Sequence, residues 1–333
     1  MNRILKTFLP QSTQRKNKFK RFSQRTLCTL WLSLFLSACT STPSNPTRTF
    51  TQLPTASATA ESVATSTSVS LNTPDATTQA VTPTTTLMPD GWMKLPVVPQ
   101  SVSQRVHEIY AEGQKLGNRP NVFSLIGDCD ATPTWFLGDF DLGPKHYNLG
   151  PYTDLQDEID YFKGSYSRQS LAVRRGFVAA SVLTPLWADP KQCTKGDTPL
   201  SCELHVNKPA FAFILLGTND YNHREVFEPN MRKILDALIA SGVVPILGTK
   251  ADNMEGDYTL NATIAKLAYE YQLPLWNFWA ATQPLPAHGL DTDLTHLTWG
   301  PNDFSDQSHV QTAWPWRNLT ALQTLKAVWS AVK

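Results

Sequence analysis

The stretch Val122-Phe123-Ser124-Leu125-Ile126-Gly127-Asp128-Cys129 places a short apolar run directly before a glycine turn and a thiol. A run of this kind, bounded by turn residues, predicts a strand that is buried on both faces of a parallel sheet. The strand would fix the backbone, and the turn would project the next side chain into a cleft. Cys129 is therefore the first candidate nucleophile of this chain.

Further apolar runs of the same character follow, and helical patterns alternate with them. We expect strands at residues 211–216, 243–247 and 273–278, and helices at residues 102–116, 225–240, 260–271 and 318–332. Strands that alternate with helices predict an α/β fold, a three-layer αβα sandwich with a parallel sheet. Ligands of such folds bind beyond the carboxyl ends of the strands, which is where the polar motifs of this chain fall.

The N-terminus has the features of an export signal. Residues 1–26 contain eight Lys or Arg and no acid, and the apolar run 27–38 ends in Leu36-Ser37-Ala38 before Cys39. A basic segment and a short apolar segment of this kind predict a signal peptide at residues 1–38. The ending resembles the lipobox of bacterial lipoproteins, which implies cleavage before Cys39, a lipid on its sulfur and anchoring at the cell membrane or cell surface. An ordinary secreted protein and a signal anchor are the alternatives.

The rest of the chain divides into a tether and one domain. Residues 39–91 are rich in Ser, Thr and Pro with few large apolar side chains, so they predict a disordered tether. Residues 92–333 suit a single α/β domain. Without the first 26 residues, 21 basic residues remain against 28 acidic ones. This net charge of −7 argues against a nucleic-acid partner, and the sequence gives no indication of the oligomeric state.

The cysteines fall into separate classes. Cys28 lies in the signal, and Cys193 and Cys202 flank a polar loop. In an exported protein, a disulfide between Cys193 and Cys202 is expected. Cys129 is then left unpaired outside the cytoplasm, where a free thiol requires a chemical reason.

Two further polar motifs complete a pattern with Gly127-Asp128-Cys129. Gly217-Thr218-Asn219-Asp220 follows the apolar run 211–216, and Asp293-Leu294-Thr295-His296 precedes the last helix. In this order and approximate spacing, the three motifs resemble the SGNH (GDSL-type) hydrolase family, and the resemblance covers the whole globular part. It implies a flavodoxin-like αβα fold and cleavage of a carboxylic ester, with no metal and no organic cofactor.

The resemblance also implies a catalytic triad. Cys129 would attack the ester carbonyl, His296 would take the proton, and Asp293 would orient the imidazole. Asp306-Gln307-Ser308-His309 repeats the Asp-x-x-His spacing, so His309 is a rival base. We favour His296, because Leu297-Thr298 after it is closer to the family's pattern.

The oxyanion of the reaction would need hydrogen-bond donors. The resemblance implies the side chain of Asn219, the backbone N–H of Cys129 and a glycine N–H from a second motif. Gly176 and Gly164 are both candidates for that glycine, and the sequence does not choose between them. Supporting roles at the turns fall to Gly127, Asp128, Gly217 and Asp220.

The sequence departs from the family at the nucleophile, because the family has serine where this chain has Cys129. A thiol near an imidazolium is expected to ionise more easily than a free thiol. Two alternatives stay open. The site could bind without turnover, or another residue could attack, with candidates Ser165, Ser167 and Ser170.

The substrate class is only outlined by the sequence. Tryptophans gather near the expected histidine loop, and aromatic faces suit sugar rings as well as core packing. These are Trp276, Trp279, Trp299, Trp314 and Trp316. The sequence thus favours a lipid-anchored hydrolase of a small-molecule or glycan ester, with an acetyl ester as one option. The alternatives are an inactive glycan-binding protein on the same fold and an O-acyltransferase.

Overall fold

The computed structural model describes residues 90–306 and 308–333. The predicted signal peptide, Cys39 and residues 39–89 of the predicted tether lie outside the described residues. No helix in the described ranges combines the length and the apolar character that a membrane crossing requires. The first element of the described chain is the 3-10 helix η2 (Gly91–Lys94).

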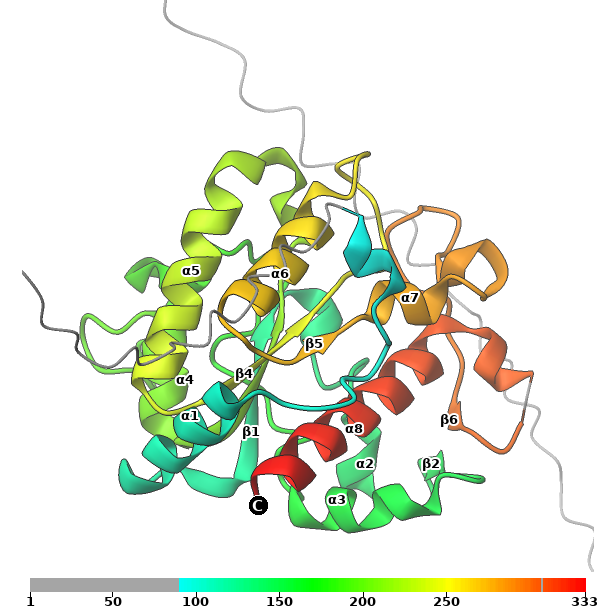
Figure 1. Ribbon diagram of the computed structural model, residues 1–333, viewed down its shortest axis with the longest axis horizontal. Coiled ribbons are helices and arrows are strands. Elements are labelled where there is room, and N and C mark those ends of the chain that lie inside the picture. The colour runs from blue at the N-terminus through cyan, green and yellow to red at the C-terminus, as the bar shows by residue number, and fades with distance from the viewer. Residues whose placement is uncertain (1–89, 307) are drawn as a thin grey trace, which may run out of the picture. The chain divides into compact units, whose positions relative to one another are not determined.

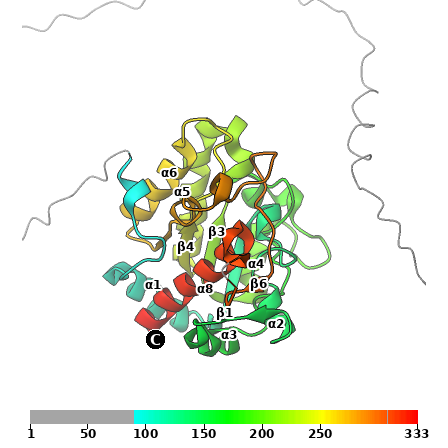
Figure 2. The ribbon, with the colours of Figure 1, turned by 90° about the vertical axis from the view of Figure 1, so that its right-hand side faces the viewer.

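A four-stranded sheet forms the centre of the described domain. Its strands are β1 (Arg119–Gly127), β3 (Pro209–Leu215), β4 (Val244–Gly248) and β5 (Leu275–Trp276). They follow the order β1-β3-β4-β5, and every pairing is parallel. Figure 2 shows β1, β3 and β4 of this sheet. The four predicted strands are confirmed, although β5 is shorter than expected. A flavodoxin-like sheet has an additional strand beyond β1, and here a single bridge between Gly127 and Val173 takes that place.

Helices cover both faces of the sheet, as the three-layer prediction requires. Right-handed connections between successive parallel strands place α4, α5 and α6 on one face. On the other face, Tyr110 of α1 stacks on Phe211 of β3, and Trp276 of β5 donates a hydrogen bond to Thr320 of α8. The bounds are α1 (Gln104–Lys115), α4 (Pro199–Asn207), α5 (Arg224–Ala240), α6 (Thr259–Glu270) and α8 (Ala313–Val332).

Shorter elements fill the connections. A small second sheet pairs β2 (Tyr147–Asn148) with β6 (Asn302–Asp303) in parallel. The short α-helices are α2 (Asp139–Leu142), α3 (Gln156–Tyr161) and α7 (Phe278–Thr282). The 3-10 helices are η3 (Cys129–Ala131), η4 (Thr153–Leu155), η5 (Ser181–Leu183), η6 (Pro185–Trp187), η7 (Thr218–Asn222), η8 (Pro286–Gly289) and η9 (His309–Gln311). The end of α8 lies beside α3, where Tyr161 stacks on Trp329 (Figure 1).

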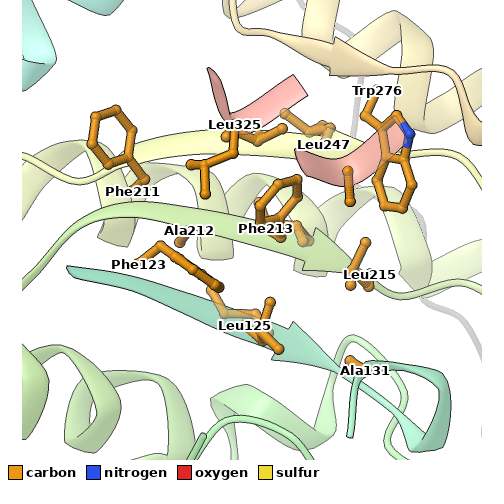
Figure 3. Close-up of a cluster of buried hydrophobic side chains, with 14 of the residues drawn as sticks. Phe123, Leu125, Ala131, Phe211, Ala212, Phe213, Leu215, Leu247, Trp276 and Leu325 are labelled. Carbon is orange, nitrogen blue, oxygen red and sulfur yellow. The ribbon is translucent and has the colours of Figure 1, made fainter. Parts of the chain in front are cut away.

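Aromatic side chains from β1 and β3 form the core beneath α8. Phe123 and Phe213 meet edge to face with ring centroids 6.1 Å apart, and both are completely buried. Leu125, Phe211 and Leu325 belong to the same buried cluster (Figure 3). Each such side chain contributes about 1.5–3 kcal/mol on burial. This packing makes β1 a rigid support for the turn that follows it.

The opposite face of β1 carries a buried polar network instead. Glu203 of α4 is completely buried and accepts hydrogen bonds from Ser124 Oγ at 2.5 Å, Arg168 Nη1 at 2.6 Å and Leu171 N at 2.8 Å. The predicted disulfide between Cys193 and Cys202 is formed, and Cys202 directly precedes Glu203 in α4. The network therefore joins α4 to β1 and to the chain segment that starts at residue 168.

A second buried carboxyl group, Glu158 of α3, predicts an unusual pH dependence of stability. Both carboxyl oxygens lack a hydrogen-bond partner among the described residues, and burial raises the pKa of Glu158 well above its ordinary value. Between the unfolded pKa and this raised pKa, the unfolded chain loses a proton that the folded protein keeps, so stability falls as pH rises. Glu158→Gln should therefore raise the free energy of unfolding by about 1–3 kcal/mol at pH 8 and change it little at pH 4.

Urea unfolding at the two pH values measures this difference. Asp157→Asn, which removes an exposed carboxylate from the same helix, is the matched control and should have little effect at either pH. An equal gain for Glu158→Gln at pH 4 and pH 8 would contradict the explanation.

Candidate active site

The turn after β1 presents Cys129 at the end of the sheet. A Cβ atom at Gly127 would lie 2.7 Å from both Ala131 Cβ and Leu215 O, so a side chain at this position would collide with its neighbours. Asp128 caps η3 by accepting a hydrogen bond from the backbone N–H of Asp130 at 3.0 Å. Cys129 is half-buried and unpaired, and its backbone N–H donates to no described residue. The turn thus offers a thiol and a backbone donor together.

The loop between η8 and β6 holds His296 against Asp293. Asp293 Oδ1 accepts the backbone N–H groups of Thr295 and His296 at 3.0 and 2.9 Å, which folds the loop back on itself. Asp293 Oδ2 lies 2.6 Å from His296 Nδ1. Leu294 between them has a φ of 59°, which is the left-handed region of the backbone. This conformation is energetically unfavourable for a residue other than glycine, and such strained residues are common at functional sites. The loop thus sets the orientation of the imidazole.

Charges within this pair stabilise each other. The backbone and side-chain N–H groups of His296 lower the pKa of Asp293 to about 2. The hydrogen bond that His296 donates to Asp293 in turn raises the pKa of His296 above its ordinary value. An ionised Asp293 accepts a hydrogen bond from the Nδ1–H group of His296, which keeps the ring proton on Nδ1. Nε2 of His296 has no partner among the described residues. His296 therefore has the tautomer that a general base needs.

The candidate nucleophile and the candidate base line one cleft of about 520 Å³. Three tryptophans and three carboxylates share its wall with a single arginine, so the cleft is both aromatic and charged. Its residues are Cys129, Asp130, Thr132, Trp135, Arg175, Asp291, Asp293, His296, Leu297, Trp299 and Trp314. Of the predicted tryptophans, Trp299 and Trp314 line the cleft, whereas Trp276 is a buried core residue.

The rival residues are not in this cleft. His309 lies 3.5 Å from Asp306 through Nε2, but it does not line the cleft. Ser165 and Ser170 are buried: Ser165 Oγ accepts from Phe123 N, and Ser170 Oγ donates to Leu125 O. Ser167 Oγ donates a hydrogen bond to Asp141 Oδ2. Among the described residues, Cys129 remains the candidate nucleophile of the site.

Backbone pairing brings Gly176, and not Gly164, beside the turn. Gly127 N donates to Ala172 O at 3.1 Å, and Gly127 O accepts from Arg174 N at 3.3 Å. Gly176 follows with a φ of 79° and is exposed, and its N–H has no partner among the described residues. Gly164 N instead donates to Asp141 at 2.7 Å. Of the two glycines that the sequence left open, Gly176 has the N–H without a described partner. Arg175 before it lines the cleft, whereas Gly176 itself does not.

Asn219 links the turn after β1 to the segment that carries Gly176, but it does not line the cleft. Its Nδ2 donates to Asp128 Oδ2 at 3.0 Å and to Phe177 O at 3.2 Å, so both amide hydrogens are engaged. Gly217 before it has a φ of 130°, which disfavours any other residue there. Asp220 Oδ1 accepts from Ala179 N, and burial raises the pKa of Asp220 to about 6. In this arrangement Asn219 and Asp220 brace the segment that carries Gly176.

The expectation that the thiol ionises easily is wrong for this site. Burial and the carboxylates of Asp128 and Asp130 raise the pKa of Cys129 to about 11. The element after the turn is one 3-10 turn, too short to supply a helix dipole that would favour a thiolate. Arg175 acts in the opposite direction but does not outweigh the two carboxylates. At neutral pH the resting nucleophile is therefore a thiol.

Two charged residues beneath the turn were not found from the sequence. Arg317 of α8 is buried, donates through Nη1 to the backbone oxygen of Asp130 at 2.5 Å, and lies over the rings of Phe136 and Trp314. Asp130 follows the candidate nucleophile directly, and burial raises its pKa as well. A cavity of about 20 Å³ separates these groups from Asp252, enough for one water molecule.

Ligand atoms of Asp128, Cys129 and Asp130 lie within 4.8 Å of one another, as a metal site would require. However, the two oxygens of Asp128 already accept hydrogen bonds from Asp130 N and Asn219 Nδ2. The acceptor atoms of Asp128 are thus directed to protein donors, and we assign no metal or cofactor to this group.

No protein-family model and no curated protein matches the sequence. The structure is similar to that of a GDSL-like lipase from Bacteroides thetaiotaomicron, with 15% sequence identity and a TM-score of 0.39. The match covers 68% of this chain and 100% of the lipase chain.

Proposed function

We propose that this protein is an SGNH-type ester hydrolase with Cys129 as nucleophile, His296 as base and Asp293 as its orienting partner. One observation carries the proposal. His296 lines the same cleft as the thiol, Asp293 engages its Nδ1, and its Nε2 has no partner among the described residues. This is the arrangement of nucleophile, base and orienter that acyl transfer requires.

The protonation state of the thiol decides how the first step would run. Because the pKa of Cys129 is about 11, the sulfur attacks the ester carbonyl while His296 Nε2 removes its proton. The carbonyl electron pair moves to oxygen, where we propose the N–H groups of Cys129 and Gly176 as donors, since neither has a partner among the described residues. When the tetrahedral intermediate collapses, the C–O bond breaks and His296 returns the proton to the departing alcohol.

Hydrolysis of the resulting thioester completes the cycle. A water molecule attacks the acyl carbon as His296 takes its proton. The C–S bond then breaks, the carboxylic acid leaves, and the sulfur regains a proton. If an alcohol replaces water in this step, the same residues perform acyl transfer. The proposal includes an extracytoplasmic location, a lipid on Cys39 and an ester on a glycan, with an acetyl ester as one option. Trp135 and Trp299, which are exposed at the cleft, would contact the sugar.

A second candidate function is glycan binding without turnover. The raised pKa of the thiol and the engaged side chain of Asn219 favour it, since both weaken the groups that chemistry would need. Exposed tryptophans at the cleft suit a sugar in either case.

Ester hydrolysis by the domain without its tether separates the two functions. We expect turnover of a short-chain aryl ester by the wild-type protein and its loss in Cys129→Ala, while Cys129→Ser keeps the donors and tests oxygen as nucleophile. His309→Ala is the control for the base and should keep activity. Full activity in Cys129→Ala would refute the proposed nucleophile. If no acyl ester is turned over while a glycan binds, the binding function is the correct one.

A further inference from the structure

Asp130 is placed to control the thiol that it follows. Cys129 Sγ and Asp130 Oδ1 lie 4.0 Å apart, within the range of a long hydrogen bond to sulfur. The backbone of Asp130 is held on both sides: its N–H donates to Asp128 Oδ1, and its C=O accepts from Arg317 Nη1. Both Cys129 and Asp130 line the cleft. The backbone from which the Asp130 carboxylate projects is thus fixed beside the thiol.

The cations around the turn do not form a side-chain hydrogen bond with the Asp130 carboxylate among the described residues. Arg317 gives its hydrogen bond to the backbone oxygen of Asp130, so the Asp130 carboxylate receives no described side-chain donor other than the thiol. Arg175 lowers the pKa of the thiol, and Arg317 also interacts with the thiol electrostatically. The charged and titratable groups around the pair are Asp128, Arg175, Asp252, Asp293, His296 and Arg317.

We propose that Asp130 is a positioning residue that accepts the S–H hydrogen bond of Cys129 and holds the thiol protonated. The inference concerns regulation of the nucleophile in the proposed function. It can be tested on the thiol itself, whether or not the protein hydrolyses esters.

A protonated thiol is a weak nucleophile towards electrophiles in solution. The raised pKa of Cys129 agrees with such a restraint. Reaction is then confined to molecules that are held where His296 can take the proton. This would protect an unpaired cysteine in an exported protein from unspecific alkylation and disulfide exchange.

Alkylation with iodoacetamide measures the restraint as a function of pH. The thiolate sulfur attacks the methylene carbon, iodide leaves, and the thiol proton goes to solvent. Asp130→Asn keeps the shape but removes the charge, so we expect about tenfold faster alkylation at pH 8 and a midpoint about one pH unit lower. Arg175→Gln should have the opposite effect and slow the reaction. Asp157→Asn, an exposed carboxylate on α3, is the charge-matched control and should leave the profile unchanged.

Faster alkylation and a lower midpoint in folded Asp130→Asn, with no change in Asp157→Asn, support the proposal. An Asp130→Asn profile that superimposes on the wild-type profile overturns it. If Asp130→Asn does not fold, the thiolate absorbance of the wild-type protein decides. A midpoint at or below that of a free thiol, about pH 8.5, also overturns the proposal.

Discussion

Asp293→Asn is expected to lower kcat for ester hydrolysis by about 1,000- to 10,000-fold while leaving the fold intact. An ionised Asp293 fixes the proton of His296 on Nδ1 through the 2.6 Å contact, which leaves Nε2 free to accept a proton. An asparagine amide can instead donate to Nδ1 and move the ring proton to Nε2. The imidazole would then have the wrong tautomer to act as base.

The pH profile of the same variant tests the electrostatic part of the argument. Because Asp293 raises the pKa of His296, the acidic limb of kcat/KM in the wild-type protein should have its midpoint above the ordinary histidine value. The base is active when neutral, so activity is gained as pH rises through that midpoint. In Asp293→Asn the midpoint should move towards lower pH, and residual activity should persist in more acidic buffer.

Asp306→Asn is the matched control, because Asp306 and His309 repeat the spacing of Asp293 and His296 outside the cleft. Its kcat and pH profile should match the wild-type values. Loss of activity in Asp306→Asn, with Asp293→Asn unaffected, would show that the base had been assigned to the wrong histidine.

The strands and the turn motifs could be predicted from the sequence because their signals are local. The apolar run before Gly127 and the glycine itself lie within one short segment, as does the contact of Asp293 with His296 three residues later. Helix α4 was missed, because Glu203 and Asn207 are buried in it among apolar residues, so the stretch does not show the usual amphipathic pattern.

The electrostatics of the site could not be predicted because they depend on residues far apart in the chain. Arg317 is 187 residues from Asp130, and nothing in its sequence surroundings indicates that it donates to the nucleophile turn. Burial and two carboxylates raise the pKa of Cys129, whereas the histidine of the motif suggested a lowered pKa. The choice of Gly176 over Gly164 also required the pairing of Gly127 with Val173.

Glu203→Gln is expected to lower the free energy of unfolding by about 3–5 kcal/mol, because it breaks a buried charged network. Three donors now converge on the Glu203 carboxylate, from Ser124, Arg168 and Leu171. A glutamine offers one oxygen and one NH₂ group, so at least one of these donors would meet another donor. The guanidinium of Arg168 would also lose its charge partner.

The same substitution should also weaken the site, because Leu171 begins the segment that pairs with Gly127 and carries Gly176. We expect a lower kcat with a smaller change in KM, since an oxyanion donor acts mainly in the transition state. Glu228→Gln is the matched control. Glu228 forms ion pairs with two cations, Arg232 and Lys266, but near the surface, where such pairs contribute about 0–1 kcal/mol. Urea unfolding of both variants gives the comparison. If Glu203→Gln costs no more stability than Glu228→Gln, the buried network does not hold the site-bearing segment in place.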